Sequence, residues 1–464
     1  MPSSLVSVSE SNAATSRSYS VIGLAKSGVA AANALHRRGH SVIASDPGTL
    51  EKLADHLARI QDGVQVKLGA NVMRDGDIVV VSPGVPPCAP IFAEARERGL
   101  EVIGEIALFQ RLQPNSPVLA VTGTDGKSTT TAWLGAICAG DGPAWVGGNI
   151  GIPLCEAVDQ LTSAHLVIAE VSCFQLTTAA EFHPRVAIFT NLAPDHLNYY
   201  SGSVEEYYGA KKRLLANLGP DETAVLNYDD PVLRTWSAPG EARTLWYSRQ
   251  PLPYGLDGAY VRDQAMYERN DGVQQRIMQL SDLPLPGVHN VENALAAALG
   301  ARAWGISMTS VQDGLLTFGG LEHRIERVGV VDDVTWYNDS KATNPHAAQA
   351  ALRAFSDQPH KMVLLCGGSE KDADFGPWAD LASEHCAHVI CFGQTGPQLA
   401  AALGKRVPVT EVADMTAAIR VARKVAPRGG TVVLSPACAS FDQFDNFEHR
   451  GDVFKSLVNA LTGC

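Results

Sequence analysis

The stretch VTGTDGKSTTT, which begins at Val121, combines residue types that could bind phosphate. Glycines let backbone N–H groups turn toward an anion, a lysine balances its charge, and a hydroxyl can ligate a metal ion. Gly123 and Gly126, Lys127 and Ser128 supply these three features. Because Val121 stands where the usual nucleotide-binding loop has its first glycine, the stretch is a shorter variant of that loop.

Asp125 is the unexpected member of this loop, because a carboxylate repels phosphate. Aspartate tolerates left-handed turn geometry and can hydrogen-bond to its own backbone. We therefore expect the side chain of Asp125 to serve the turn and to face away from a bound phosphate.

Carboxylate and imidazole groups follow two other apolar segments. Glu170 ends the segment AHLVIAE, and Asp195 and His196 follow VAIFTNL. The carboxyl ends of parallel strands meet at one edge of a sheet, where the ligands of such sheets bind. Magnesium prefers oxygen ligands and takes few of them from the protein, so these residues could hold it beside the phosphates. The alternative is a capped strand end and an ordinary surface histidine.

Cationic and hydroxyl residues recur farther along the chain. Lys211 and Lys212 lie in EEYYGAKKRLLANL, which has the pattern of a helix, and such lysines commonly form only a solvated face. Further polar residues follow or flank later apolar segments; they are Arg324, Asp339, Lys341, Thr343, Lys371 and Ser440. Their number exceeds what the capping of strand ends requires, and it indicates an anionic small molecule as ligand.

Three successive α/β units are expected to position these residues, after a disordered lead-in at 1–18. The first unit, at 19–115, opens with strand, glycine turn, helix and strand in YSVIGLAKSGVAAANALHRRGHSVIASDP. Its glycine pattern indicates NAD only weakly, because Ala25 stands where a dinucleotide-binding fingerprint has its middle glycine. The pattern restarts before the phosphate-type loop, which gives a central domain at 116–320, and a third section follows at 321–464.

The composition is that of a globular protein with neither a nucleic-acid nor a membrane partner. The 464 residues carry a net charge of -12, and no Lys- or Arg-rich run interrupts the acidic background. Nine cysteines are scattered singly, which favours a reducing compartment over a disulfide framework. The N-terminus lacks the apolar core of a signal peptide, and no segment offers ~18 uninterrupted apolar residues. We therefore expect a cytoplasmic protein that acts as a monomer.

Nine motifs together resemble those of the Mur ligases of peptidoglycan synthesis, in the expected order and across residues 20–458. They are TGTDGKSTTT, GGNIG, EVSCFQL, NLAPDHL, YYGAKKR, HNVENALAA, GLEHRIE, NDSKATNP and SPACASFDQFDNFEHRG. NDSKATNP and the last block are most similar to the members that add D-glutamate. The resemblance implies an α/β protein of three domains: a Rossmann-like N-terminal domain, a central domain with the mostly parallel sheet of P-loop ATPases, and a Rossmann-like C-terminal domain.

The resemblance also implies a reaction. Members of the family use ATP and magnesium to phosphorylate a substrate carboxylate, and an incoming amine then attacks the acyl phosphate to form an amide. Here the carboxylate would belong to UDP-N-acetylmuramoyl-L-alanine and the amine to D-glutamate. Two magnesium ions are implied, and so is a carbamate on Lys211, which turns a side chain with a pKa of ~10.4 into an anionic oxygen ligand.

The residues that match the family's motifs divide into overlapping sets. ATP is expected at Gly123, Thr124, Gly126, Lys127, Ser128, Thr129, Asn290, Asn293, Arg324 and Asp339, and metal at Ser128, Glu170, His196 and Lys211. The UDP substrate is expected at Lys26, Ser27, Asp46, Ser82, Pro83, Gly84, Asn149, Gln175 and His196. D-Glutamate is expected at Lys341, Thr343, Lys371, Ser440, Phe441 and Phe447. Lys127, His196, Lys211 and Lys341 are the expected catalytic residues.

The sequence departs from the family's pattern in four places. The family usually has Asn at Asp125, Ser-Ser at Ser172-Cys173 and an Asp-Arg or similar polar pair at Asn198-Tyr199. Pro47-Gly48 replaces residues that often include a side chain in contact with uridine. None of these changes removes a phosphate or metal ligand, so catalytic activity is expected.

Two alternatives stay open. A sister ligase, which adds another amino acid or extends folate with glutamate, would keep the ATP-binding half and differ in the third domain, and NDSKATNP argues against it. A nucleotide-binding homologue without turnover would keep only the fold, and the joint presence of Lys127, Glu170, His196 and Lys211 opposes it.

Overall fold

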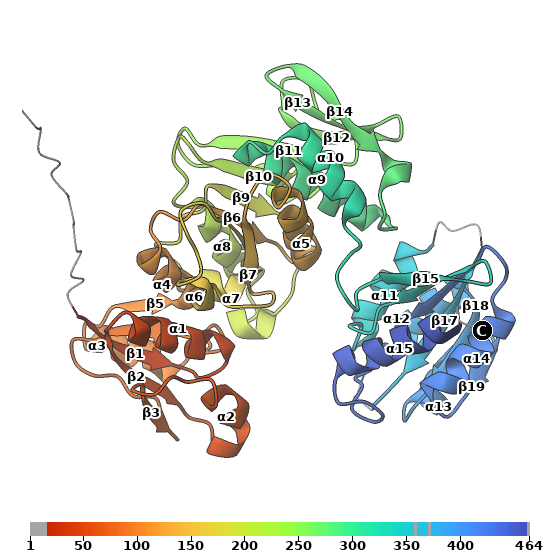
Figure 1. Cartoon of the computed structure of the whole chain (residues 1–464), viewed down its shortest axis with the longest axis horizontal. Coiled ribbons are helices and arrows are strands. Elements are labelled where there is room, and N and C mark those ends of the chain that lie inside the picture. Colours follow the sequence, from red (N-terminus) through yellow and green to blue (C-terminus); the bar gives the residue numbers. More distant parts are fainter. Residues whose placement is uncertain (1–15, 357–359, 370–372, 462–464) are drawn as a thin grey trace, which may run out of the picture.

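Three β-sheets, each packed with helices, follow one another along the chain and along the long axis of the molecule (Figure 1). The computed structural model describes residues 16–356, 360–369 and 373–461. Most of the expected lead-in at 1–18 lies outside these residues, and the first strand already begins at Ser18. The predicted α/β class, with Rossmann-like first and third parts around a mostly parallel central sheet, is confirmed.

The first sheet has five parallel strands in the order β3-β2-β1-β4-β5. Its strands are β1 (Ser18–Ile22), β2 (Ser41–Asp46), β3 (Gln65–Leu68), β4 (Ile78–Val81) and β5 (Val102–Gly104), and its helices are α1 (Lys26–Arg37), α2 (Leu50–Leu57), α3 (Pro90–Glu97) and α4 (Glu105–Leu112). The strand–turn–helix–strand opening that the sequence predicts is therefore present. Small buried alanines in α1 let this helix lie close to the sheet.

The central sheet has nine strands in the order β14-β13-β12-β11-β10-β9-β6-β8-β7. They are β6 (Val118–Thr122), β7 (Ala144–Gly148), β8 (Leu166–Glu170), β9 (Val186–Phe189), β10 (Thr223–Asn227), β11 (Arg243–Ser248), β12 (Gly258–Arg262), β13 (Ala265–Asn270) and β14 (Val273–Gln279). Neighbouring strands from β7 to β12 run parallel, and β13 and β14 close one edge as antiparallel strands. Strands buried on both faces explain the unbroken apolar runs in this part of the sequence.

Helices cover the central sheet. The α-helices are α5 (Lys127–Cys138), α6 (Leu154–Ala157), α7 (Cys173–Leu176), α8 (Val204–Lys212), α9 (Val288–Trp304) and α10 (Met308–Thr317), and the 3-10 helices are η1 (Leu197–Tyr200), η2 (Arg213–Leu215), η3 (Leu233–Thr235) and η4 (Leu280–Asp282). Helix α9 is buried along most of its length, where its alanines and leucines pack against α5 and the sheet. Within the described part of the chain, no helix is long and apolar enough to cross a membrane.

The third sheet has six strands in the order β15-β16-β20-β17-β18-β19, and all neighbours except β15 and β16 run parallel. The strands are β15 (Glu326–Val331), β16 (Val334–Asn338), β17 (Met362–Gly367), β18 (Cys386–Phe392), β19 (Val409–Glu411) and β20 (Thr431–Leu434). The helices are α11 (Pro345–Ala354), α12 (Gly376–His385), α13 (Gly396–Leu403), α14 (Met415–Val425) and α15 (Phe447–Leu461).

The first and central sheets are joined at a contact that buries a carboxyl group. Glu105, at the start of α4, is 2% exposed, and its Oε1 accepts a hydrogen bond of 2.6 Å from the backbone N–H of Cys155 at α6. The thiol of Cys155 in turn donates to the carbonyl of Glu105 at 3.3 Å. Burial raises the pKa of Glu105 to about 7. The contact is therefore most favourable when this carboxyl group is neutral.

We predict that Glu105→Gln makes the protein less sensitive to rising pH. Because its pKa is raised on folding, the stability that the neutral acid contributes is complete below the unfolded pKa of 4.5 and is lost as the pH rises toward about 7. Relative to the wild type, the variant should gain roughly 3 kcal/mol in unfolding free energy across this window, as measured by urea denaturation.

Glu156→Gln is the matched control, since Glu156 lies on α6 directly after Cys155 but is paired with Arg59 at the surface. It should leave the pH dependence almost unchanged. If Glu105→Gln and the wild type show parallel stability curves, the pKa of Glu105 is not raised on folding and the prediction fails.

Candidate active site

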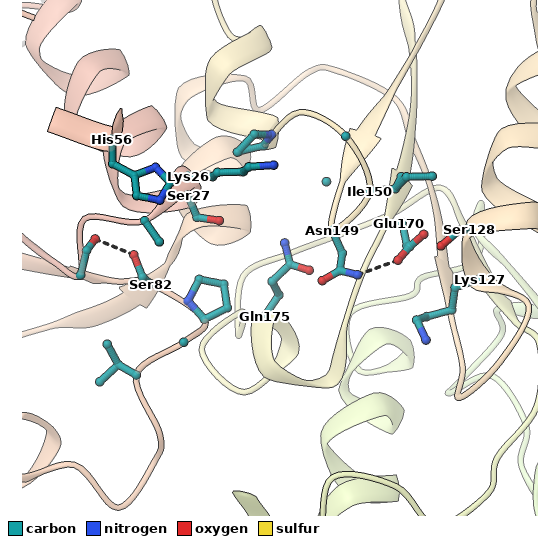
Figure 2. Close-up of a pocket in the computed structure, with 18 of the residues that line it drawn as sticks. Lys26, Ser27, His56, Ser82, Lys127, Ser128, Asn149, Ile150, Glu170 and Gln175 are labelled. Atoms are coloured by element: carbon teal, nitrogen blue, oxygen red, sulfur yellow. Dashed lines mark hydrogen bonds between the residues drawn. The ribbon is translucent and has the colours of Figure 1, made fainter. Parts of the chain in front are cut away.

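A cleft of about 1260 Å³ lies where the three sheets face one another, and the phosphate-type loop forms part of its wall (Figure 2). Loops of the first sheet contribute one side of this cleft, and Arg324, Lys341 and Phe447 of the third sheet reach it from another. The predicted residues that the structure brings together here are Lys26, Ser27, Asp46, Ser82, Pro83, Gly84, Thr124, Gly126, Lys127, Ser128, Asn149, Glu170, Gln175, Arg324, Lys341 and Phe447.

The phosphate loop, residues 123–128, has the geometry that its glycines predict. Gly123 and Gly126 have φ values of 145° and 78°, a region that other residues rarely adopt. A Cβ atom on Gly126 would lie 2.3 Å from Oδ1 of Asn293, so only glycine fits beside α9. Lys127 begins α5, and its ammonium donates to the carbonyl of Thr124 at 2.6 Å. The helix N-terminus and the lysine thus make the wall of the cleft favourable for an anion.

Asp125 behaves differently from the expectation. Its φ is not in the left-handed region, which in this loop is taken by the two glycines. Its backbone is held instead by the two residues that follow β9. Asn191 Oδ1 accepts a hydrogen bond from the N–H of Asp125 at 2.9 Å, and the hydroxyl of Thr190 donates to the carbonyl of Asp125 at 2.6 Å. The side chain of Asp125 is exposed and lines the cleft. The expected left-handed turn geometry was therefore wrong, whereas the direction of the side chain relative to a bound phosphate stays a prediction.

Glu170 presents an unpartnered carboxylate oxygen beside the phosphate loop. The side chain is 2% exposed, and its Oε1 accepts a hydrogen bond of 2.6 Å from Nδ2 of Asn149. Oε2 is buried without a hydrogen-bond partner among the described residues. Figure 2 shows Glu170 next to Ser128, with Lys127 on the same loop. A buried oxygen that lacks a donor, beside a hydroxyl, fits a hard cation.

Lys211 is buried directly behind the phosphate loop. The side chain is 1% exposed, its Nζ donates to the carbonyl of Gly123 at 2.5 Å, and it lies 4.7 Å from the centre of the Tyr207 ring. Burial lowers its pKa to about 8. The alternative of a solvated lysine face on α8 is therefore wrong for Lys211, whereas Lys212 lies 5.3 Å from the ring of Trp236 and is exposed.

His196 lies at the start of η1 with a φ of 51°. Its side chain is 50% exposed, and Nε2 is 3.4 Å from Oδ2 of Asp195. The ring of Phe174 lies 5.0 Å from the imidazole. His196 is not part of the wall of the cleft, so its expected contact with metal and substrate is not formed in this arrangement of the chain.

A second cavity of about 530 Å³ opens between the central and third sheets and shares Asp125, Gly126, Arg324 and Lys341 with the cleft. Four further predicted residues line it, namely Thr129, Asn290, Asn293 and Asp339. The two asparagines are hydrogen-bonded to each other at 3.2 Å. Burial raises the pKa of Asp339 to about 7, and its Oδ2 accepts from the hydroxyl of Ser435 at 2.8 Å. The predicted nucleotide residues other than Gly123, which lines neither, are therefore split between two connected cavities.

Several predicted residues do not reach either cavity. Ser440 is buried, Phe441 is 73% exposed, and Thr343 also lies off the walls of both cavities. Lys371 lies outside the described residues. Of the five described residues expected to bind D-glutamate, Lys341 and Phe447 line the cleft, where the ammonium lies 5.4 Å from the centre of the Phe447 ring.

The first-domain side of the cleft contains residues that the sequence did not single out. His56 on α2 and Asn71 line it together with Asp46, and Figure 2 shows His56 near Lys26. Both oxygens of Asp46 already accept backbone hydrogen bonds, from Leu24 at 2.8 Å and Gly48 at 2.7 Å, so this carboxylate braces two turns. His289 and Glu292 of α9 are additional residues of the second cavity, and their place in HNVENALAA was the available signal.

Three family models match the chain in order. They are the Mur ligase MurD-like N-terminal domain at residues 17–104, the Mur ligase middle domain at 121–301 and the glutamate ligase domain of Mur ligases at 323–438. The chain therefore belongs to the Mur ligase family.

Curated relatives show which members of the Mur ligase family this chain is similar to. A protein of Symbiobacterium thermophilum is 41% identical over 95% of this chain and 98% of its own length, and one of Acidobacterium capsulatum is 39% identical over 96% of both. Both are named UDP-N-acetylmuramoylalanine--D-glutamate ligase.

Solved structures share the fold at lower identity. The pseudomurein peptide ligase type C of Methanothermus fervidus gives a TM-score of 0.56 at 19% identity, and it covers 96% of this chain and 100% of its own. The UDP-N-acetylmuramate-alanine ligase of Thermotoga maritima gives 0.57 at 18% identity, with 96% and 99% covered.

We predict that Asp125→Asn changes the Michaelis constant for ATP by only a few-fold and leaves turnover similar. The carboxylate is exposed, so water and salt screen its repulsion of a bound phosphate. Steady-state kinetics at two ionic strengths would measure the effect, which should shrink as salt is added. A gain of tenfold or more in ATP affinity would show that the carboxylate acts on the nucleotide at close range.

Proposed function

We propose that the protein is an ATP-dependent ligase that joins D-glutamate to UDP-N-acetylmuramoyl-L-alanine through an acyl phosphate. The observation that carries this proposal is the single cleft in which a phosphate loop, a buried carboxylate and groups of all three sheets meet. It is supported by two relatives of nearly full-length coverage, each named as a D-glutamate ligase of this kind.

The phosphate loop would hold the phosphates of ATP. Gly126, Lys127 and Ser128 at the start of α5 line the cleft, where their backbone N–H groups and the ammonium of Lys127 would neutralise charge on the transferred phosphoryl group. The nucleoside end would enter the second cavity, in which Asn290 and Asn293 offer amide groups and Arg324 a guanidinium. Since Gly126 and Arg324 belong to both cavities, one ATP molecule could span them.

Magnesium fits the pair Ser128 and Glu170. Oε2 of Glu170 has no hydrogen-bond partner among the described residues, and magnesium usually takes only one or two carboxylates together with phosphate and water oxygens. Bound there, the ion would neutralise charge on the phosphates.

Lys211 would serve the proposed second metal site as a carbamate. Carbamate formation requires the neutral amine, and the lowered pKa of Lys211 increases the fraction of this form at neutral pH. Its hydrogen bond to the carbonyl of Gly123 places this side chain in contact with the phosphate loop, as a metal ligand beside the phosphates would require. His196 would join this site only after a movement that brings it to the cleft.

The two substrates other than ATP, UDP-N-acetylmuramoyl-L-alanine and D-glutamate, would bind on opposite sides of the phosphate loop. Lys26, Ser27 and the segment Ser82, Pro83 and Gly84 would hold the UDP moiety, and Asn149 and Gln175 lie between them and the phosphate loop (Figure 2). Lys341 would receive a carboxylate of D-glutamate. Closure of the three domains around the substrates would be needed to bring Thr343, Ser440 and Phe441 nearer.

We further propose that the protein is a monomer in the cytoplasm, with domain boundaries at 115/116 and 320/321. The boundaries agree with the gaps between the three matched family models, at 105–120 and 302–322. The single scattered cysteines, eight of which are free thiols in the described residues, fit a reducing compartment.

We predict that D-glutamate is strongly preferred as the amino-acid substrate. Lys341 is exposed in this structure, but once the domains close around the substrates a cation without its carboxylate partner would be left desolvated, so D-alanine should be a very poor acceptor. An amino-acid panel assayed for ADP release with UDP-N-acetylmuramoyl-L-alanine tests this directly. Comparable turnover with D-alanine or L-lysine would contradict the proposal and favour a sister ligase.

We predict that Lys211→Ala loses most of the activity and that small carboxylates such as formate or acetate restore part of it. The carboxylate would occupy the place of the carbamate in the cavity left by the truncated side chain. Lys212→Ala is the matched control, because its neighbouring ammonium is exposed on the same helix. Near-normal turnover of Lys211→Ala would show that no carbamate is required.

A further inference from the structure

Tyr199 connects the central domain to the first domain at the edge of the cleft. It lies on η1, three residues after His196, and its hydroxyl donates to the carbonyl of Val85 at 3.1 Å. The carbonyl of Pro83 lies 3.4 Å from the same oxygen. Burial raises the pKa of Tyr199 to about 12, so the phenol stays protonated and remains a donor at neutral pH.

The segment that accepts this hydrogen bond is residues 82–86, here called the substrate loop, and every one of its residues lines the cleft. At its other end Ser82 is fixed within the first domain, because its hydroxyl donates to the carbonyl of Gly23 at 2.8 Å and its N–H to that of Ile22 at 2.9 Å. A turn, closed by the N–H of Val85 on the carbonyl of Ser82, lies between the two ends. The substrate loop is thus held by its own domain at one end and by Tyr199 at the other.

The ring of Tyr199 is itself fixed by aromatic neighbours. Phe174 meets it edge-on at 4.4 Å between ring centres, and Tyr200 lies at 5.0 Å. Phe174 also contacts His196 and directly precedes Gln175, which lines the cleft. The position of the hydroxyl is therefore tied to the segment that carries His196 and to α7.

Other polar contacts between the first and central domains lie away from the cleft. They include the hydrogen bonds between Glu105 and Cys155 and the ion pairs Arg37 with Asp159, Arg59 with Glu156 and Arg111 with Glu181, and none of these residues lines the cleft. These pairs hold the domains together, whereas Tyr199 acts where a ligand that spans both domains would bind. A ligand with two separate ends binds more tightly when the groups for both ends are already in the correct relative position.

We propose that Tyr199 is a positioning residue that holds the substrate loop in register with the His196 segment, so that both ends of the UDP substrate bind at once. The inference rests on the proposed function, because it requires a substrate whose nucleotide lies on the first domain and whose acyl end lies on the central domain.

Tyr199→Phe tests the proposal, because it removes the donor and keeps the ring. Calorimetric titration should show binding of UDP-N-acetylmuramoyl-L-alanine weakened about 3- to 10-fold, the range expected for one hydrogen bond. Binding of UDP alone, which engages only the first domain, should change less than 2-fold. The Michaelis constant for the UDP substrate should rise by the same factor as its Kd, with kcat and the Michaelis constant for ATP nearly unchanged.

Tyr208→Phe is the matched control, since Tyr208 belongs to the same aromatic region and lines neither cavity. It should bind both ligands as the wild type does, and thermal melting should show both variants folded. Equal weakening of UDP and of the complete substrate by Tyr199→Phe would overturn the register argument, and so would no weakening of either. A wild-type protein that binds UDP but not the complete substrate would overturn the proposed function as well.

Discussion

The parallel pairing of β6 with β8 and β9 is the constraint on which the rest of the site depends. Val121 is opposite Glu170 across one ladder, and Thr122 is opposite Phe189 across the other. Because parallel strands end at the same edge, the phosphate loop, the buried carboxylate and the segment that holds Asp125 must emerge side by side. A shift of one residue in the β6–β8 ladder would move Glu170 to the other face of the sheet. The cleft is therefore a consequence of strand register, and the loops complete it.

The parts of this arrangement that depend on local chemistry could be predicted from the sequence. The glycines at 123 and 126 predict positive φ angles in the loop. Apolar runs that end in polar residues predict buried parallel strands. The conformation of Asp125 could not be predicted, because Thr190 and Asn191 impose it from more than 60 residues away. His56 and Tyr199 carry no motif, and only the packing of the domains places them at the cleft or its edge.

In the third domain, the segments that carry the proposed D-glutamate residues are supported by a residue that the sequence did not single out. Arg450 on α15 is fully buried, and its guanidinium donates to the carbonyls of Cys438 at 3.0 Å and Ser340 at 2.8 Å, and to the hydroxyl of Ser340 at 3.0 Å. A further contact of 3.5 Å reaches the carbonyl of Gly367. The segments after β16, β17 and β20 are thereby joined at one point. The planar fork of arginine suits this task, because several carbonyls can share one rigid donor group.

Arg450 and Lys211 are both buried cations, but they differ in how many groups stabilise their charge. Both cations are buried, and burial lowers the pKa of each, to about 10 for Arg450 and about 8 for Lys211. Arg450 recovers its lost hydration through several oxygen acceptors, so its burial stabilises the fold without further partners. Lys211 has one carbonyl acceptor and one aromatic face in the described residues. A lysine in such surroundings is poorly stabilised as an ammonium, and its conversion to an anionic group beside bound magnesium would remove this deficit.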